Sequence, residues 1–342
     1  MSDEKALGCL ALDVGGANIK AAHSRGDTAS ASFALWKDPG RLTAELRVLG
    51  HRLPQAHEIR LTMTAELCDC FPTKADGVRH VVRAVQCWSG DRALWVWGND
   101  GRFHSAATIE ADPALAAASN WLALATALAR RAQSAAGLLI DIGSTTADLI
   151  PFEDGRVLEV GRTDTERLKT GALVYAGVRR TPLCALTNTI ELGEASIGVA
   201  AELFATTLDV YLMLGDIEED ASDHDTADSQ PATRNGAQSR LCRMVCADPT
   251  ELSDTDVMGL AEAFHRSLLR RLVLHAGNLL RRLTREVDLV VVSGSGEFLA
   301  RRVADSVMST QTRILSLRNE WGADATIAAC ARALLELEPT GS

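Results

Sequence analysis

The sequence LLIDIGSTTADLIPF, residues 138–152, places a short run of small and hydroxyl residues between two apolar stretches. The first apolar stretch ends at Asp141 and the second resumes around Asp148, and each is typical of a buried β-strand. Such a hairpin turn lets backbone N–H groups approach an anion closely, and hydroxyl groups add further donors. The residues of this predicted phosphate-binding turn are Gly143, Ser144, Thr145 and Thr146.

A second stretch with the same spacing occurs near the start of the chain, LALDVGGANIKAA at residues 10–22. Asp13 aligns with Asp141, 128 positions later, and Lys20 aligns with Asp148. Two unrelated hairpins are the alternative explanation, because acidic and glycine-rich turns are common in hairpins. The shared spacing favours two subdomains of similar build that face one another. The predicted phosphate-binding residues of this first turn are Gly15, Gly16 and Asn18.

Length and composition fit a globular protein with about two domains. The 342 residues are 46% apolar, which is enough for a sizeable core. The net charge of −10 and the isoelectric point near 5.3 argue against a nucleic-acid-binding protein, which usually has a basic face. The eight cysteines form no dense framework, and neither a secretory signal nor a stretch of 18 apolar residues is recognisable. We therefore expect a reduced, cytoplasmic, soluble protein that binds neither nucleic acid nor membrane.

The two turns and the acids beside them predict a site for phosphate and magnesium. Carboxylates repel phosphate, but they can hold a hydrated Mg²⁺ that bridges to phosphate oxygens. The predicted magnesium ligands are Asp13, Asp141 and Asp148, and Lys20 is predicted to contact phosphate. For Lys20, a solvated side chain at a strand end is the alternative. We expect Asp13, Lys20 and Asp148 to be catalytic.

A third glycine-rich element follows a short buried strand, in LVVVSGSGEFLA at residues 289–300. The three elements, in this order, resemble the actin, sugar kinase and heat-shock ATPase superfamily, in which the third element lies near the nucleotide. The resemblance implies phosphate contacts by Gly294 and Gly296 of the turn 293–296. It also implies a two-lobed actin-like (ribonuclease H-like) α/β fold with a central cleft that faces both hairpins.

The expected lobes divide the chain after about residue 135. Lobe one covers 1–135 and contains the first hairpin, and lobe two covers 136–320 and contains the second hairpin. A C-terminal helix at 322–338 is expected to pack back on lobe one. The segment 216–236 is acidic and poor in apolar residues, which predicts a mobile loop, with a lid over the cleft as the alternative.

Longer blocks narrow the resemblance to one family. The most specific blocks are TAELCDCF at residues 64–71 and RTDTERLKTGALVYAGVRRTP at residues 162–182. Both are similar to hydantoinase/oxoprolinase-like proteins of tetrahydromethanopterin-linked C1 transfer, and the resemblance runs over nearly the whole chain. Archaeal members join an aminomethylfuran-methyl diphosphate to the phenol oxygen of glutamyl-tyramine and release pyrophosphate. The resemblance implies a transferase of this type in methanofuran or methylofuran biosynthesis, with a tail on the amine that can differ in bacteria.

The residue types suit that reaction. The furan ring donates electrons to the methylene carbon, so loss of diphosphate leaves a stabilised cation. Hydrogen-bond donors and Mg²⁺ are then needed where charge develops on the leaving diphosphate. The phenol, whose unperturbed pKa is ~10, has to lose its proton during attack, and a nearby carboxylate can accept it. The expected partners are therefore small molecules, a furan diphosphate and a tyramine derivative.

Polar residues in the most specific blocks are the candidates for substrate binding. The residues after the predicted strand 58–63 fit this role because ligands collect at the carboxyl ends of strands in such folds. Arginine side chains suit a diphosphate or a glutamyl carboxylate. Helix capping, ordinary ion pairs and solvent exposure are the alternatives. The predicted substrate-binding residues are Glu66, Asp69, Lys74, Asp164, Arg167, Arg179 and Arg180.

Two other functions stay open from the sequence. The SGSG turn favours an enzyme that uses ATP besides Mg²⁺, either a kinase or an ATP-coupled hydantoinase/oxoprolinase-type hydrolase. A non-catalytic, nucleotide-switched scaffold is the other alternative, and the intact acids at positions 13, 141 and 148 speak against it. Cys68 and Cys70 predict no zinc site, because no second pair has suitable spacing. A homodimer is compatible with all three functions.

Overall fold

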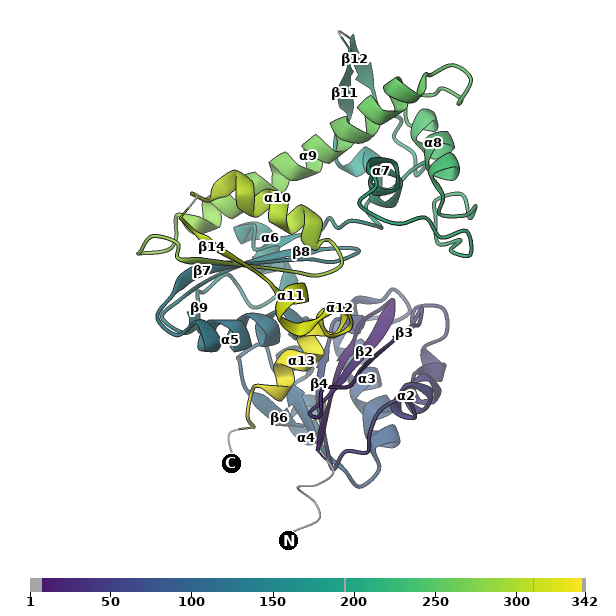
Figure 1. The fold of residues 1–342 in the computed structure, drawn as a ribbon. Helices are drawn as coiled ribbons and strands as arrows, with labels where there is room; N and C mark the ends of the chain where they lie inside the picture. Colours follow the sequence, from purple (N-terminus) through teal and green to yellow (C-terminus); the bar gives the residue numbers. More distant parts are fainter. Residues whose placement is uncertain (1–7, 194, 310, 340–342) are drawn as a thin grey trace. The chain divides into compact units, whose positions relative to one another are not determined.

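The computed structural model describes residues 8–193, 195–309 and 311–339, which fall into two compact units (Figure 1). Unit one comprises the described residues of Met1–Gly137, Ile150–Thr170 and Leu315–Ser342. Unit two comprises those of Leu138–Leu149 and Gly171–Ile314. The chain therefore passes between the units more than once, and both ends of the described chain belong to unit one.

Unit one is built on a six-stranded sheet with the strand order β3-β2-β1-β4-β5-β6. The strands β1, β2 and β3 pair antiparallel, whereas β1, β4 and β5 pair parallel. Five consecutive positions of β1 are buried, as is typical of a strand covered on both faces. The strands are β1 (Cys9–Val14), β2 (Asn18–His23), β3 (Thr28–Ser32), β4 (Glu58–Met63), β5 (Ala93–Trp97) and β6 (Phe103–Ser105).

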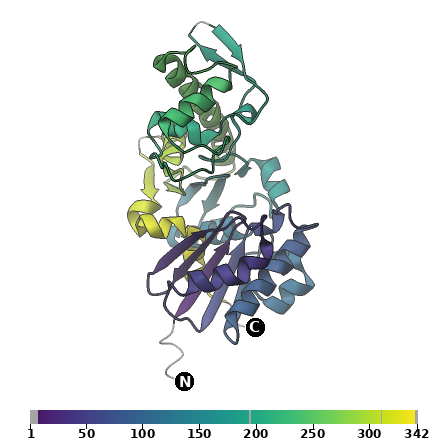
Figure 2. The ribbon, with the colours of Figure 1, turned by 90° about the vertical axis from the view of Figure 1, so that its right-hand side faces the viewer.

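Helices pack against this sheet and against each other. The helix α3 contacts α2, β4 and β5, and α13 contacts α5, β1 and β4. Figure 2 shows the purple helix α2 lying across the strands of this unit. The helical segments are η1 (Pro39–Arg41), α2 (Leu42–Gly50), η2 (Ala65–Leu67), α3 (Lys74–Ser89), α4 (Ala106–Ala111), η3 (Pro113–Ala116), α5 (Asn120–Ala132), α6 (Asp164–Thr170), α11 (Leu317–Trp321), α12 (Ala323–Ile327) and α13 (Ala329–Leu335).

The second sheet has the strand order β10-β8-β7-β13-β14, with the short β9 beside β8. A separate hairpin pairs β11 with β12. The helix α9 contacts α7, α10 and β11, and α10 also contacts β13. The elements are β7 (Ala136–Ile142), β8 (Ala147–Glu153), β9 (Arg156–Val157), β10 (Leu173–Val174), η4 (Leu183–Ala185), β11 (Thr189–Leu192), β12 (Ala195–Gly198), α7 (Thr207–Leu214), α8 (Arg234–Arg243), α9 (Asp254–Leu280), β13 (Leu289–Ser293), α10 (Glu297–Val307) and β14 (Arg313–Ser316).

The internal repeat predicted from the sequence is present in the structure. The order β3-β2-β1-β4 of the first sheet corresponds to β10-β8-β7-β13 of the second. In the first hairpin the Gly15 N–H donates to the Asn18 carbonyl oxygen at 3.0 Å. In the second hairpin the Gly143 N–H donates to the Thr146 carbonyl oxygen at 2.8 Å. The two turns are thus closed by the same hydrogen bond at equivalent positions.

Candidate functional site: two hairpin turns and a buried glutamate

Asp13 and Lys20 face each other across the first hairpin, as cross-strand partners of β1 and β2. The Asp13 side chain is buried, and its Oδ1 atom has no hydrogen-bond partner among the described residues. Burial raises the pKa of Asp13, while Lys20 and the Asn120 side chain counteract this by favouring the carboxylate. Lys20 forms no ion pair in the described part of the chain, so its ammonium group is available to an anion.

The backbone of the first turn is held through its carbonyl groups. The Leu35 N–H donates to the Gly16 carbonyl oxygen at 2.9 Å, and the Phe33 N–H donates to that of Ala17 at 2.9 Å. The N–H groups of Gly16 and Ala17 donate to no other described residue. A Cβ atom on Gly16 would lie 2.8 Å from the Cys68 sulfur, so the turn accepts no larger residue without a shift of that side chain. These unused amides suit an anionic ligand.

The second turn is held in the same way by the segment that follows β10. The N–H groups of Arg179 and Arg180 donate to the Ser144 carbonyl oxygen at 3.1 and 2.9 Å. A Cβ atom on Gly177 would lie 2.4 Å from the Gly143 carbonyl oxygen, so only glycine permits this close approach. The structure thus brings the two predicted arginines next to the second turn.

The glycine turn after β13 packs against the base of the second hairpin. The Gly296 N–H donates to the Ile142 carbonyl oxygen at 2.8 Å. Gly294 has φ of +91°, and a Cβ atom there would lie 2.2 Å from the same carbonyl oxygen. The N–H groups of Ser144 and Thr145 donate to no other described residue. Unit two therefore assembles all of its predicted phosphate-binding segments around one strand end.

The three acids predicted to bind magnesium are divided between the units. Asp13 belongs to unit one, whereas Asp141 and Asp148 belong to unit two. Asp141 lies beside the glycine turn, since a Cβ atom on Gly294 would be 2.7 Å from its Oδ1 atom. Asp148 lies opposite Leu173 of β10. No group of three or more His, Cys, Asp or Glu side chains that could hold a metal occurs among the described residues, and the magnesium ligands stay a prediction.

Glu66 is a buried carboxyl group directly after β4, in η2, and only 1% of the residue is exposed. Neither carboxylate oxygen has a hydrogen bond of normal geometry within the described chain. Burial raises the pKa of Glu66 to about 7, and the Asp164 carboxylate adds to this, whereas Lys74 and the amides of Glu66 and Ala118 oppose it. A Cβ atom on Gly77 would lie 2.6 Å from the Glu66 backbone, so α3 approaches Glu66 only through a glycine.

Asp164 and Arg167 form an ion pair on α6, with the Arg167 Nη2 atom 2.8 Å from the Asp164 Oδ1 atom. The guanidinium group of Arg167 is buried and stacks over the Trp121 ring at 4.4 Å. An ion pair was the alternative to substrate binding for these two residues; the pair is present, and substrate binding by them stays a prediction. The Asp164 charge also raises the pKa of Glu66.

The structure places the remaining predicted residues of unit one as follows. Lys74 is the first residue of α3, after the capping residue Thr73, and its charge acts on Glu66. Asp69 is exposed. Sequence reasoning missed Asn120, whose side chain bonds Asp13. Its position at the start of an apolar helix was the available signal, because asparagine is common at helix starts.

The acidic segment 216–236 is tied to its own unit by hydrogen bonds and ion pairs. The Asp220 N–H donates to the Ala232 carbonyl oxygen at 2.9 Å, and Asp223 forms an ion pair with Arg179. The last residues of the segment begin α8, which the sequence did not predict. Arg179 of the predicted substrate site is therefore paired, and the mobility of the segment stays a prediction.

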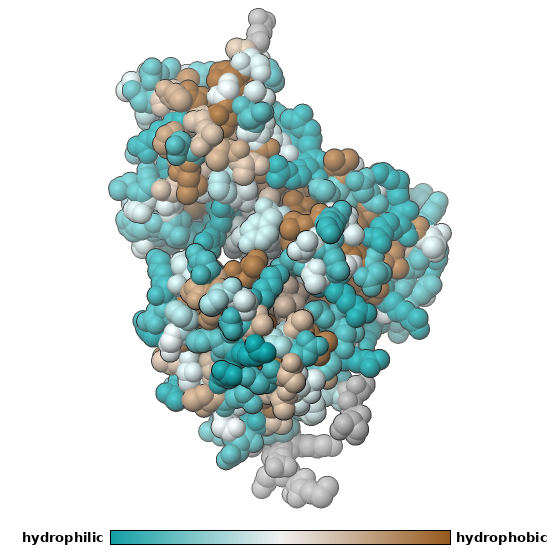
Figure 3. Space-filling model, turned by 180° about the vertical axis from the view of Figure 1, so that it is seen from behind, coloured by the Kyte–Doolittle hydropathy of each residue, from teal (hydrophilic) through white to brown (hydrophobic). Residues whose placement is uncertain are grey.

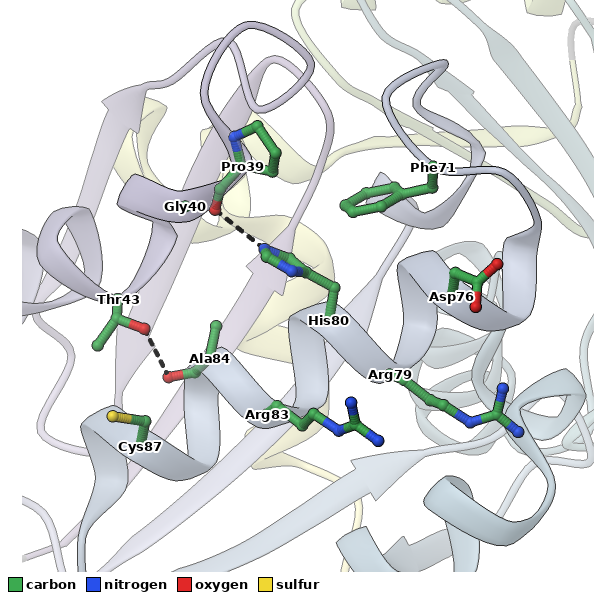
Figure 4. A pocket seen from close by; sticks show the side chains of 10 residues that line it. All are labelled: Pro39, Gly40, Thr43, Phe71, Asp76, Arg79, His80, Arg83, Ala84 and Cys87. Atoms are coloured by element: carbon green, nitrogen blue, oxygen red, sulfur yellow. Dashed lines mark hydrogen bonds between the residues drawn. The ribbon is translucent and has the colours of Figure 1, made fainter.

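An open pocket of about 490 Å³ lies on unit one, and its lining residues include several of α3 (Figure 4). Its polar groups already have partners within the protein. The His80 ring nitrogen Nε2 bonds the Pro39 carbonyl oxygen at 2.9 Å, and Arg79 and Arg83 pair with Glu110. Because none of the predicted site residues lines this pocket, we do not assign it to the active site.

The apolar residues on the face shown in Figure 3 lie in small patches that are separated by hydrophilic residues. Seven large apolar side chains are exposed in the described chain, and the most exposed of them are Val48 and Leu274 at 62% each. No described helix combines the length and the apolar character needed to cross a membrane.

Comparison with known proteins identifies the family. The hydantoinase/oxoprolinase family model matches residues 59–330. The chain is 30% identical, over 96% of its own length and 96% of the relative, to a (4-{4-[2-(γ-L-glutamylamino)ethyl]phenoxymethyl}furan-2-yl)methanamine synthase of Methanocaldococcus jannaschii. A protein of the same name from Methanococcus vannielii is 30% identical over 56% of this chain and 85% of the relative.

Among solved structures, the nucleotide-free structure of acetone carboxylase matches with a TM-score of 0.55. The match covers 95% of this chain and 70% of that chain at 12% identity, so the likeness is one of fold. Together with the repeated hairpin-and-strand order, it confirms the predicted actin-like α/β fold. The match of the family model and the near-full-length relative confirm the resemblance found in the sequence. The chain belongs to the hydantoinase/oxoprolinase family.

Proposed function

We propose that this protein is a transferase that forms an aryl–alkyl ether between an aminomethylfuran-methyl diphosphate and the phenol of (glutamyl)tyramine, with release of pyrophosphate. The observation that carries the proposal is the 30% identity to the M. jannaschii synthase over 96% of both chains. The name of that relative describes a phenoxymethyl link between a phenol and a furan methanamine. The reaction serves the biosynthesis of methanofuran or methylofuran for C1 metabolism in the tetrahydromethanopterin pathway.

The leaving diphosphate is the group that needs the protein most, because negative charge develops on it as the bond to carbon breaks. The unused amides of the first turn, at Gly16 and Ala17, and of the second turn, at Ser144 and Thr145, suit phosphate oxygens. Lys20 adds a cation without an ion-pair partner in the described chain. Each turn is the proposed phosphate-binding element of its own unit.

Mg²⁺ fits the carboxylates beside the turns. The Oδ1 atom of Asp13 is buried and lacks a hydrogen-bond partner among the described residues, which suits an oxygen that faces a hydrated cation. Asp141 and Asp148 are the proposed ligands in unit two. When bound, Mg²⁺ neutralises charge on the diphosphate. Lys20 and the amides of the first turn are the groups proposed to orient phosphate in unit one.

A direct assay tests the proposal. The purified full chain is incubated with the furan diphosphate and tyramine or glutamyl-tyramine, and ether and pyrophosphate are quantified by mass spectrometry and a coupled phosphate assay. We expect equal amounts of ether and pyrophosphate, formed only when both substrates and Mg²⁺ are present. Asp13→Asn should abolish this turnover, whereas Asp91→Asn, at an exposed position, should not. Absence of the ether in the complete mixture contradicts the proposal.

An ATP-using kinase or ATP-coupled ring hydrolase is the second candidate. It is favoured by the SGSG turn, in which Gly294 and Gly296 lie against the base of the second phosphate turn. The acetone carboxylase of similar fold is described as working by ATP-dependent carboxylation. Isothermal titration calorimetry with ATP and Mg²⁺ separates the candidates, because no binding at millimolar ATP eliminates the second one.

A further inference from the structure

Glu66 lies just beyond the C-terminal end of β4, on the side of the first sheet where its parallel strands end. It follows β4, which pairs in parallel with β1, so that Thr62 is in register with Asp13. Ligands of open α/β sheets collect at this edge. The residue is buried to 99% of its surface, yet both carboxylate oxygens lack a hydrogen bond of normal geometry in the described chain. A buried carboxyl group is usually hydrogen-bonded, so this exception points to a partner that arrives with the substrate.

Charged groups on two helices act on the pKa of Glu66. Asp164 on α6 favours the protonated form, and Lys74 on α3 favours the carboxylate, as do the amides of Glu66 and Ala118. No ion pair within 4.0 Å joins Glu66 to a cation of the described chain. Glu66 is therefore not held by a cation of the described chain, whereas Asp164 is paired with Arg167.

We propose that Glu66 is the proton acceptor of the ether-forming reaction, and the inference rests on the proposed function. The phenol oxygen forms a bond to the furan methylene carbon, and the bond from that carbon to diphosphate breaks, with its electron pair leaving on the diphosphate. The phenol proton passes to the Glu66 carboxylate, directly or through one water molecule. The proton is released to solvent after the ether leaves, so no oxidant or reductant is needed.

The environment of Glu66 suits this task better than that of Asp13. Burial raises the pKa of Asp13 against the opposing effects of Lys20 and Asn120, and its free oxygen is the one proposed to face Mg²⁺. Glu66 has a pKa of about 7, close to the pH at which a cellular base has to accept and release protons. The next residue in the chain, Leu67, is 51% exposed.

The experiment compares the pH dependence of kcat/KM for wild type, Glu66→Gln and Asp91→Asn in the ether assay. For wild type we expect kcat/KM to fall as the pH decreases below about 7, because the base becomes protonated. Glu66→Gln should lower kcat/KM at pH 8 by a factor of about 100 or more and should lose this acid limb. Asp91→Asn should reproduce the wild-type profile. A Glu66→Gln enzyme that keeps the limb, or loses less than about tenfold, overturns the inference.

A series of ring-fluorinated tyramines separates a base from a residue that only supports the fold. An acidic phenol needs a base less, so Glu66→Gln should lose least activity with the most acidic phenol. An equal loss with every phenol overturns the inference. If Glu66→Gln does not fold, Glu66→Asp is measured in its place. Its kcat should be lower than that of wild type, but its kcat/KM should still fall at low pH. A pH profile of Glu66→Asp without this fall contradicts the inference. If the wild-type protein forms no ether, the proposed function is refuted together with the inference. If the wild-type protein is active, the variants test the role of Glu66 alone.

Discussion

Removal of the buried charge at position 66 should stabilise unit one at high pH. In the folded protein the pKa of Glu66 is raised from its ordinary value of 4.5 to about 7. The folded state therefore binds the proton more tightly than the unfolded state, and stability falls as the pH rises through this window. The penalty is absent below the unfolded pKa and complete above the folded pKa. Glu66→Gln keeps the shape of the neutral acid and cannot ionise, so it avoids the penalty.

The magnitude follows from the pKa shift. Each pKa unit corresponds to about 1.4 kcal/mol, so the shift of Glu66 amounts to about 3 kcal/mol at pH 8. At pH 5 most of the penalty has disappeared, and the two proteins should differ by less than about 1 kcal/mol. Asp13 also has a raised pKa, but its contribution is present in both proteins and cancels in the difference.

The assay is urea unfolding at pH 5 and pH 8, followed by tryptophan fluorescence. All six tryptophans lie in unit one, so the signal reports the unit that contains Glu66. The exposed-site variant Asp91→Asn serves as the matched control and should follow wild type at both pH values. The reasoning is refuted if Glu66→Gln and wild type differ by the same unfolding free energy at pH 5 and at pH 8. Ionisation of Glu66 would then not destabilise the folded protein.

Three further substitutions test other parts of the structure. Gly177→Ala places a Cβ atom 2.4 Å from the Gly143 carbonyl oxygen, so it should lower the melting temperature and weaken pyrophosphate binding measured by calorimetry. Lys20→Ala should weaken the binding of magnesium pyrophosphate by a factor of about 10 or more, since a charged hydrogen bond contributes about 1.5–3 kcal/mol. Asp209→Asn leaves the fully buried Arg240 with Asp228 as its remaining acidic partner among the described residues. The substitution should cost about 3 kcal/mol in urea unfolding followed by circular dichroism.

The strands and hairpins of the core could be predicted from the sequence because each apolar run ends at a local turn signal. The apolar run before Asp141 gives β7, and the small residues after it give the turn. The alanine-rich stretch 113–134 is broken before Asn120, between η3 and α5. Ala118 has φ of +49°, and the Ser119 hydroxyl bonds the Trp97 carbonyl oxygen at 3.0 Å. That bond joins residues far apart in the chain, so no local pattern reveals it.

The candidate site shows the same limit. The turns could be located by their composition, and the arginines at 179 and 180 by the family resemblance. The burial of Glu66 depends on the close approach of Gly77 on α3, and the role of Asn120 depends on its contact with Asp13. Both are tertiary contacts. From the sequence alone, a glutamate after a strand can equally be a substrate-binding residue or a solvent-exposed loop residue.

The central claim is that the protein makes a carbon–oxygen bond at the expense of a diphosphate. The most direct measurement is mass spectrometry of the product formed from furan diphosphate and ¹⁸O-phenol tyramine with Mg²⁺. The account predicts an ether that retains the ¹⁸O label, with one unlabelled pyrophosphate released per ether. Loss of the label from the ether, or hydrolysis of the furan diphosphate without any ether, would contradict it.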